Sequence, residues 1–297
     1  MAEYIWLNGQ VLPMGEARIG VEDRGFQFAD GVYEVVRFYG GKCFTLDQHL
    51  ARLEKSAGAL RIPLPLPLPT LKSAIRDLVR RNGELEGMVY LQLTRGEAER
   101  SHPFPRNPKP TLLFYTRALP PVWQPGEGEG VKILSIADER WNRCWVKSVA
   151  LLPNIMAKQE AVEADCDEAV FILDGTITEC SASNIFFVKE SKVYTHPAGS
   201  RVLPGITRQV LTEICSDLGI ELVEEGMPAD DARLADEIFI TSTTREVNWV
   251  RQWDGKVVAG GKCGRLTHLL HGAYRKLVLA QTARTPHEGA RAVVASA

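Results

Sequence analysis

A stretch without any periodic pattern divides the chain into two parts. Residues 117–132, RALPPVWQPGEGEGVK, are rich in Pro, Gly and Glu, and Pro and Gly interrupt helices and strands alike. A chain of 297 residues, 45% of them hydrophobic, is long enough to bury two cores. We therefore predict an N-terminal α/β domain over residues 1–117, a linker over 118–131 and a C-terminal domain over 132–280. Residues 281–297, QTARTPHEGARAVVASA, are small and polar enough to form a loose tail.

Both parts contain strand-like and helical patterns. Runs of β-branched and aromatic residues indicate strands, and apolar residues at helical spacing indicate helices. In the first part, the predicted strands cover residues 3–9, 31–41 and 88–96, and the predicted helices 46–60 and 70–83, the second ending in a Gly cap. In the second part, the predicted strands cover 131–136, 168–175, 184–196, 237–247 and a hairpin at 252–258, and the helices 153–164, 206–219 and 230–236. This alternation has no fixed repeat length, which favours an α/β or α+β fold over a solenoid.

Composition excludes several kinds of partner. The net charge is −2 and the basic residues are spread along the chain, so nothing favours a nucleic acid or a membrane surface as partner. No apolar run approaches the roughly 18 residues of a membrane-spanning helix, and the first residues lack the pattern of a secretory signal. Six scattered cysteines without a C-x-x-C pair favour reduced thiols in a cytoplasm over disulfides or a metal site.

Two lysines in residues 141–161, WNRCWVKSVALLPNIMAKQEA, stand in different surroundings. Lys158 lies in a helical pattern, where a solvated surface lysine is expected. The other face of that helix would carry the apolar residues Ile155, Met156, Ala161 and Val162. Lys147 lies in an apolar run and, in a strand, would share a face with Trp145 and Val149. Burial of that face would lower the pKa of its ammonium and make it a nucleophile or Schiff-base former, whereas an edge-strand lysine reaching water is an equal alternative.

Polar residues interrupt the strands at residues 175–188, GTITECSASNIFFV. The polar members of this segment are Glu179, Ser181, Ser183 and Asn184. A carboxylate here could hold a protonated heterocyclic nitrogen. For this segment alone, however, a hairpin turn whose hydroxyls bond to the local backbone is the favoured explanation.

Two further segments could bind an anion. LPGITRQVL, residues 203–211, places a Pro-Gly turn before a helix and leaves the N–H groups of Ile206 and Thr207 free for a phosphate. TSTTREV, residues 241–247, adds a hydroxyl cluster after a buried strand. Either segment could be a simple cap. Taken together, however, a lysine, a carboxylate and two phosphate-type loops are the components of a pyridoxal phosphate (PLP) site.

With these segments in this order, the chain resembles the fold-type IV PLP enzymes, and most closely the D-amino-acid transaminases. The resemblance extends from about residue 2 to residue 258 and follows the family's order. It is carried by EDRGFQFADGVYEVVRFY, HLARLEKSA, TRGEAERSHPFP, VKS-x-x-LLPNIMAKQEA, TECSASNIF, THPAGSRVLPGITRQV and TSTTREV. The resemblance implies a two-domain α/β (α+β) transaminase with PLP between the domains. The enzyme would act on a D-amino acid and a 2-oxo acid with ping-pong kinetics.

The resemblance also assigns cofactor-binding residues. Lys147 would be the lysine that forms the Schiff base with PLP, and Glu179 would pair with the pyridine nitrogen. Leu203 would pack against the face of the ring. The residues expected to bind the phosphate are Arg52, Ile206, Thr207 and Thr243.

Substrate-binding residues follow in the same way. Tyr33, in GVYEVV, would line the substrate pocket. Arg100 and His102, in ERSHPF, match the pair by which D-amino-acid transaminases bind the substrate carboxylate from the other subunit of a homodimer. The chain differs from the common family pattern next to Lys147, at Trp145, Val149 and Ala150.

Two other classes of function share parts of this pattern. A branched-chain L-amino-acid transaminase or an aminodeoxychorismate lyase would have the same Lys147, Glu179 and Arg52. The Arg100-x-His102 pair favours the D-amino-acid enzymes, because an apolar pocket for a branched side chain has less use for it. A PLP-binding protein without activity would be indicated by loss of the lysine or the glutamate, and both are present.

Overall fold

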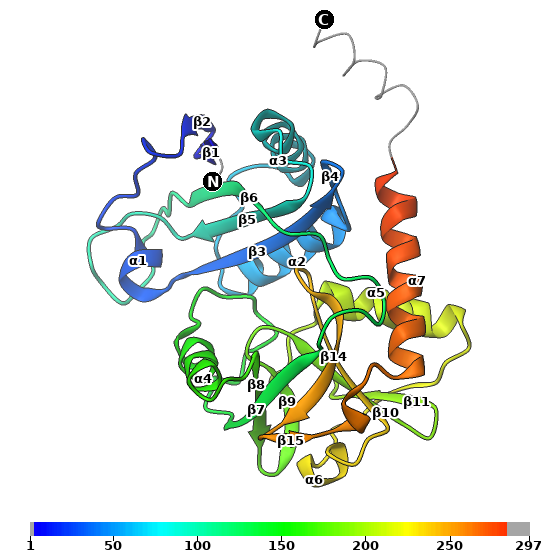
Figure 1. The fold of residues 1–297 in the computed structure, drawn as a ribbon. Coiled ribbons are helices and arrows are strands. Elements are labelled where there is room, and N and C mark those ends of the chain that lie inside the picture. The colour runs from blue at the N-terminus through cyan, green and yellow to red at the C-terminus, as the bar shows by residue number, and fades with distance from the viewer. Residues whose placement is uncertain (1–2, 284–297) are drawn as a thin grey trace, which may run out of the picture.

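The chain folds around two β-sheets (Figure 1). The computed structural model describes residues 3–283. Within that range, the first sheet has six strands in the order β2-β1-β6-β5-β3-β4, and neighbouring strands are antiparallel. The strands are β1 (Tyr4–Leu7), β2 (Gln10–Pro13), β3 (Gly31–Tyr39), β4 (Lys42–Cys43), β5 (Gly87–Thr94) and β6 (Thr111–Ala118). A short helix, α1 (Arg24–Phe28), precedes β3.

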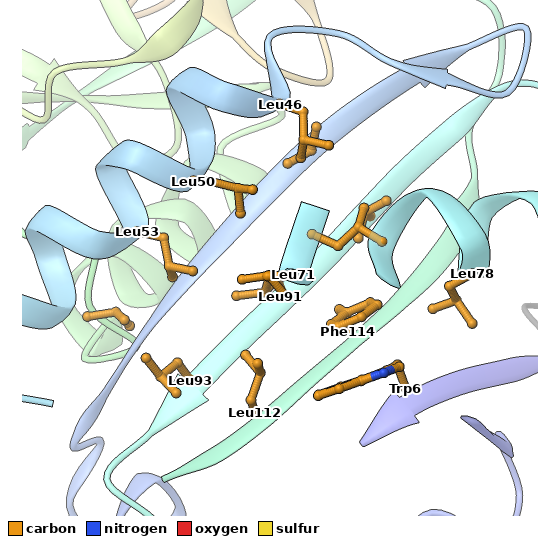
Figure 2. Close-up of a cluster of buried hydrophobic side chains, with 14 of the residues drawn as sticks. Trp6, Leu46, Leu50, Leu53, Leu71, Leu78, Leu91, Leu93, Leu112 and Phe114 are labelled. Atoms are coloured by element: carbon orange, nitrogen blue, oxygen red, sulfur yellow. The ribbon is translucent and has the colours of Figure 1, made fainter. Parts of the chain in front are cut away.

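Two helices cover one face of the first sheet, α2 (Leu46–Ala59) and α3 (Leu68–Asn82). In α2, Leu46, Leu50 and Leu53 recur at i, i+4 and i+7, so they form one apolar stripe toward the sheet. Figure 2 shows this stripe above Leu91, Leu93, Leu112 and Phe114 of the sheet. α3 ends at Gly83, whose φ of 70° lies in the left-handed region, as the predicted Gly cap requires.

Strand β3 separates this core from the second half of the molecule. Because side chains alternate along a strand, Val32 and Val36 enter the core with α2, and Glu34 binds residues of α2 on the same side. The alternate residues of the strand, Tyr33, Val35 and Arg37, face the other way. There, Arg37 donates hydrogen bonds to the Thr244 and Pro120 carbonyls, at 2.7 and 2.8 Å.

The second sheet is mixed and has nine strands within the described residues. Eight of them follow the order β12-β11-β10-β13-β14-β7-β8-β9, and β15 pairs with β14. The strands are β7 (Val131–Ala137), β8 (Glu168–Leu173), β9 (Thr176–Cys180), β10 (Asn184–Lys189), β11 (Lys192–Thr195), β12 (Leu222–Glu224), β13 (Glu237–Ser242), β14 (Glu246–Trp253) and β15 (Lys256–Val257).

Helices complete the second half. α4 (Leu152–Glu163) connects the parallel strands β7 and β8, which is the usual role of a helix in a βαβ unit. α5 (Ile206–Asp217) and α7 (Arg265–Thr282) pack against each other over the β13 and β14 strands (Figure 1). The remaining helical turns are α6 (Ala229–Ala232) and η1 (Ala259–Gly261).

This architecture confirms the predicted α/β (α+β) class. β6 ends at Ala118 and β7 begins at Val131, and the division into domains at residues 118–131 stays a prediction. The predicted tail, 281–297, lies outside the described residues except for 281–283, and α7 includes the first two of these. Over residues 3–283, no helix is long and apolar enough to cross a membrane.

The apolar face predicted for α4 is mostly exposed and does not pack on the sheet. On α4, the side chains of Ile155, Met156 and Val162 are exposed, by 60, 57 and 54%, while Ala157 and Ala161 are buried against the sheet. Alanine permits close approach of the helix to the strands, so the large apolar residues are left on the outer face. Lys158 is half-buried rather than fully solvated, and its amine donates to the Asp167 carbonyl ahead of β8.

Candidate active site

A cavity of about 630 Å³ lies where β3 faces the second sheet. Its wall is formed by Tyr33 and Val35 of β3, by the segment around Lys147, by the end of β9, and by the loops at 203–207 and 241–244. Eight of the predicted site residues line it, namely Tyr33, Arg52, Lys147, Glu179, Leu203, Ile206, Thr207 and Thr243. The structure thus brings together residues that are up to 210 positions apart in the sequence.

Lys147 lies in an irregular segment, and the strand considered for it is not formed. Its regular pairing is limited to a single bridge between Ser148 and Val32. Val146 and Ser148 are buried, whereas Lys147 between them is half-buried and directed to the cavity. The backbone is fixed on both sides, since Tyr33 N donates to the Lys147 carbonyl at 3.0 Å and Lys147 N donates to Ser56 Oγ at 3.2 Å. The segment therefore presents one amine to the cavity from a held backbone.

Tyr33 is the nearest functional neighbour of that amine. Lys147 Nζ donates to Tyr33 Oη at 3.2 Å and lies 4.3 Å from the centre of the Tyr33 ring. The ring itself stacks on Tyr90, with 5.9 Å between centroids. A cation this close to an aromatic face is attracted by the ring quadrupole, so both the ring and the hydroxyl of Tyr33 hold the amine.

Glu179, at the end of β9, is 5% exposed and binds three donors. Arg140 Nη1 donates to its Oε1 at 2.5 Å, and Asn184 Nδ2 and Leu203 N donate to its Oε2 at 3.0 and 3.1 Å. Burial raises the pKa of Glu179 to about 7, even though Arg140 and the Leu203 amide lower it. A cationic partner in the cavity would lower this pKa and leave the carboxyl fully ionised.

The sequence did not point to Arg140. Its guanidinium is held by Asp138, which accepts at 2.9 and 2.8 Å, and by the Arg201 carbonyl at 2.9 Å. Asp138 also accepts from Thr178 at 2.8 Å. Asp138 and Arg140 lie in the three residues after β7, and an acid and a base two positions apart at a strand end are the feature that could have indicated them.

Arg52 reaches the cavity from α2 and is fixed by a buried carboxylate. Glu34, fully buried, accepts from Arg52 Nε and Nη2 at 2.7 and 2.9 Å, and from His49 Nδ1 at 2.7 Å. Although burial raises the pKa of Glu34, the charges of Arg52 and His49 outweigh it and lower that pKa to about 2. Arg52 Nη1 donates to the Pro204 carbonyl at 2.9 Å, which leaves about two of its five N–H groups for a ligand.

The beginning of α5 lies beside Arg52. Gly205 is the N-cap and has no side-chain cap, so the first amides of the helix, at Ile206 and Thr207, have no partner within the helix. A Cβ at Gly205 would meet Asn184 Oδ1 at 2.1 Å, so only glycine fits between this turn and Asn184. Thr241 Oγ1, buried near the end of β13, has no hydrogen-bond partner among residues 3–283. Amides, hydroxyls and one guanidinium thus lie on one wall, and these are groups that could bind an anion.

Comparison with known proteins identifies the family of the chain. A family model described as amino-transferase class IV matches residues 31–253. A D-alanine aminotransferase of Bacillus licheniformis is 41% identical over 283 residues, which cover 95% of this chain and 99% of that protein. The chain belongs to the amino-transferase class IV family. The resemblance to fold-type IV PLP enzymes is thereby confirmed, and the chain is an aminotransferase.

Other relatives of this class IV aminotransferase include D-alanine and branched-chain amino acid aminotransferases. A D-alanine aminotransferase of Staphylococcus aureus (strain MSSA476) is 38% identical over 277 residues, which cover 93% of this chain and 98% of that protein. Among solved structures, a branched-chain amino acid aminotransferase from Escherichia coli matches with a TM-score of 0.86. It is 26% identical, and the match covers 96% of this chain and 97% of that chain.

The cavity of this aminotransferase fits its cofactor, PLP. Three donors occupy the Glu179 carboxylate, which leaves about one of its four lone-pair directions for a pyridinium N–H. The free N–H groups of Arg52 and the α5 amides suit a phosphate dianion. Lys147 supplies an amine on the same cavity wall. Over the described residues, no group of three or more potential metal ligands is found.

Two predicted substrate residues of this aminotransferase lie elsewhere. Arg100 and His102 are exposed and do not line the cavity of their own chain. They lie in the loop between β5 and β6, beside Phe28 of α1. Their assignment to the substrate stays a prediction, and it requires that they act on a cavity other than their own.

Proposed function

We propose that this aminotransferase transfers the amino group of D-amino acids, with D-alanine as a preferred donor, to a 2-oxo acid. The observation that carries the proposal is the near full-length similarity to D-alanine aminotransferases, at 41 and 38% identity. The Arg100-x-His102 pair supports it, because an arginine fork and an imidazole offer three donors to one α-carboxylate. Binding the carboxylate at a fixed place decides which face of the α-carbon is turned toward Lys147.

The cavity residues divide the chemistry and the binding among them in this proposal. Lys147 would hold PLP covalently when no substrate is bound, and its amine would otherwise take the proton from the substrate α-carbon. Tyr33 orients that amine through the 3.2 Å hydrogen bond. When bound, PLP supplies a ring that withdraws electrons from the substrate α-carbon. Glu179, ionised beside the ring nitrogen, keeps a proton on that nitrogen.

The remaining residues bind and orient. Arg52, held by Glu34, and the Ile206 and Thr207 amides bind the phosphate, and Thr243 adds a hydroxyl. Leu203 lies on the cavity wall and also binds Glu179 through its amide, so it can pack on the ring face. Arg140 and Asp138 keep the Glu179 carboxylate in place.

We also propose that the active form is a homodimer in the cytoplasm. Arg100 and His102 are exposed and remote from their own cavity, which supports a role for them at the cavity of a second subunit. The exposed apolar side chains Leu152, Ile155 and Met156 on α4 support a surface that is covered by another chain.

A branched-chain L-amino-acid transaminase is the second candidate, because a solved branched-chain amino acid aminotransferase matches with a TM-score of 0.86. A panel of D- and L-amino acids, with pyruvate or 2-oxoglutarate as acceptor, separates the two candidates. We expect turnover of D-alanine and D-glutamate and little turnover of L-leucine or L-isoleucine. Preference for the L-branched substrates would replace the first candidate by the second.

A further inference from the structure

Arg100 and His102 are held by one aromatic ring. The Arg100 guanidinium carbon lies 4.9 Å from the centroid of Phe28, and the His102 ring centroid lies 5.7 Å from it. Both side chains are exposed, so without this ring each would sample many rotamers in water. Phe28 is half-buried at the end of α1, a helix at the edge of the first sheet (Figure 1).

A buried arginine holds the backbone of the same loop. Arg24, 3% exposed, donates from Nη1 to the Ser101 carbonyl at 2.5 Å and from Nη2 to the His102 carbonyl at 3.3 Å. Its own guanidinium carbon lies 4.8 Å from the Phe28 centroid. Arg24 therefore contacts the ring and, at the same time, the backbone that carries Arg100 and His102.

Asp30 links Arg24 to the following residues of the loop. Its Oδ2 accepts from Arg24 Nε at 2.8 Å and from Arg95 Nε at 2.7 Å, and its Oδ1 accepts from Arg95 Nη2 at 2.9 Å. The Arg95 guanidinium carbon lies 3.6 Å from the centroid of Phe104. The loop is thus tied to the start of β3 at residues 101, 102 and 104.

We propose that Phe28 and Arg24 are positioning residues for substrate binding, because they fix the directions in which Arg100 and His102 leave the surface. This inference rests on the proposed function, in which that pair binds the α-carboxylate. Neither positioning residue touches PLP or the substrate. Loss of Phe28 or Arg24 would leave Arg100 and His102 less well pre-organised. Substrate binding would then be weaker, while the chemistry at Lys147 would be unaltered.

The test uses the PLP-loaded enzyme and three variants. Phe28→Leu removes the ring and keeps an apolar side chain, Phe28→Tyr keeps the ring, and Arg24→Lys keeps the charge beside Asp30 but loses the two-pronged contact with the loop. We expect Phe28→Leu and Arg24→Lys to raise KM for D-alanine about three- to tenfold, the size of one cation–π or hydrogen-bonding contact, with kcat within about twofold. Phe28→Tyr and the surface control Arg18→Gln should match the wild type.

A combined variant separates positioning from a general structural effect. In an Arg100→Ala/His102→Ala background, Phe28→Leu should leave kcat/KM unchanged, because the groups it positions are gone. An effect of Phe28→Leu that persists in full in this background, or an unchanged KM in the Phe28→Leu and Arg24→Lys single variants, would overturn the inference. If Arg100→Ala itself leaves KM for D-alanine unchanged, the carboxylate role in the proposed function fails instead.

Discussion

The Lys147 amine and the Tyr33 hydroxyl lie 3.2 Å apart, although the two residues are 114 positions apart in the chain. Tyr33 belongs to β3 of the first sheet, and Lys147 to a segment that leads from β7 into α4. The Tyr33 amide also binds the Lys147 carbonyl, so the two residues are joined through backbone and side chain. The Lys147 amine is therefore placed by contacts between the first sheet and the segment that follows β7, and its position depends on how these two parts lie relative to each other.

We expect Lys147 to be indispensable for activity and Lys158 to be dispensable. Lys147→Ala removes the cavity amine, so the purified protein should lose the pH-sensitive absorption band of covalently bound PLP and any multiple-turnover transamination. Lys158→Ala should keep both, because its amine binds the Asp167 carbonyl outside the cavity. Absorption spectra and steady-state rates of the two variants measure this. The opposite pattern would place the cofactor on Lys158.

Glu179→Gln should lower kcat more than it lowers cofactor affinity. The charge of Glu179 stabilises the ring most when electron density reaches it. Loss of this charge should therefore raise the energy of the transition state more than that of the bound cofactor. We expect a fall in kcat of about a hundredfold, in the range found when one pre-organised electrostatic contact is removed. The measurements are kcat under saturating substrate and PLP affinity of the cofactor-free protein. An unchanged kcat would remove Glu179 from the reaction.

The pH dependence of PLP binding should carry the signature of Glu179. The pKa of this carboxyl is raised to about 7 without a ligand, and a ring N–H⁺ beside it would lower that pKa. Binding then favours the ionised form, so affinity is lost as the pH falls below 7. Relative to Glu179→Gln, the wild type should weaken about tenfold per pH unit there. Parallel pH profiles of the two proteins would show that Glu179 is already ionised in the empty cavity.

Arg52→Ala should weaken both cofactor retention and the fold. Loss of a charge-assisted contact with phosphate should cost about 1.5–3 kcal/mol of PLP affinity, visible as PLP lost on gel filtration. The variant also leaves Glu34 buried without its guanidinium, which should lower the free energy of unfolding by about 3–5 kcal/mol. Because the pKa of Glu34 is lowered to about 2, this contribution is present above about pH 4.5 and is lost as the pH falls toward 2.

Two further variants calibrate that result. Arg52→Lys keeps the charge but not the fork, and should fall between Arg52→Ala and the wild type. Arg80→Ala removes an exposed arginine paired with Asp77 on α3, and should change stability by at most about 1 kcal/mol. Full PLP retention by Arg52→Ala would count against a phosphate role.

Local patterns predicted most elements of this fold. The apolar stripe of α2 and the Gly83 cap of α3 depend on neighbours within one helix, so spacing alone was sufficient. The long helix α7 was missed, and the strand considered for the segment around Lys147 is not formed. The shape of that segment is imposed by contacts with Ser56 and Gly31, more than 90 positions away, which no local pattern contains.

The candidate site shows the same limit. Residues carried by recognisable motifs, such as Lys147 and Glu179, were predicted and line one cavity. Arg140 was missed because its partner Glu179 is 39 positions away and only the fold brings them together. Glu34 was missed because a carboxylate in a strand of apolar residues gives no indication that an arginine and a histidine will surround it.

The ratio of kcat/KM for D-alanine to kcat/KM for L-leucine, measured in the wild type and in Arg100→Ala, tests the proposed function most directly. Since Arg100 would bind the α-carboxylate, its loss should lower kcat/KM for D-alanine about tenfold to a hundredfold, mainly through KM. We expect a ratio far above one in the wild type and a marked fall in the variant, because the fixed carboxylate sets the face presented to Lys147. A wild-type ratio below one, or a ratio that Arg100→Ala leaves unchanged, would contradict this assignment of substrate and of the residue that selects it.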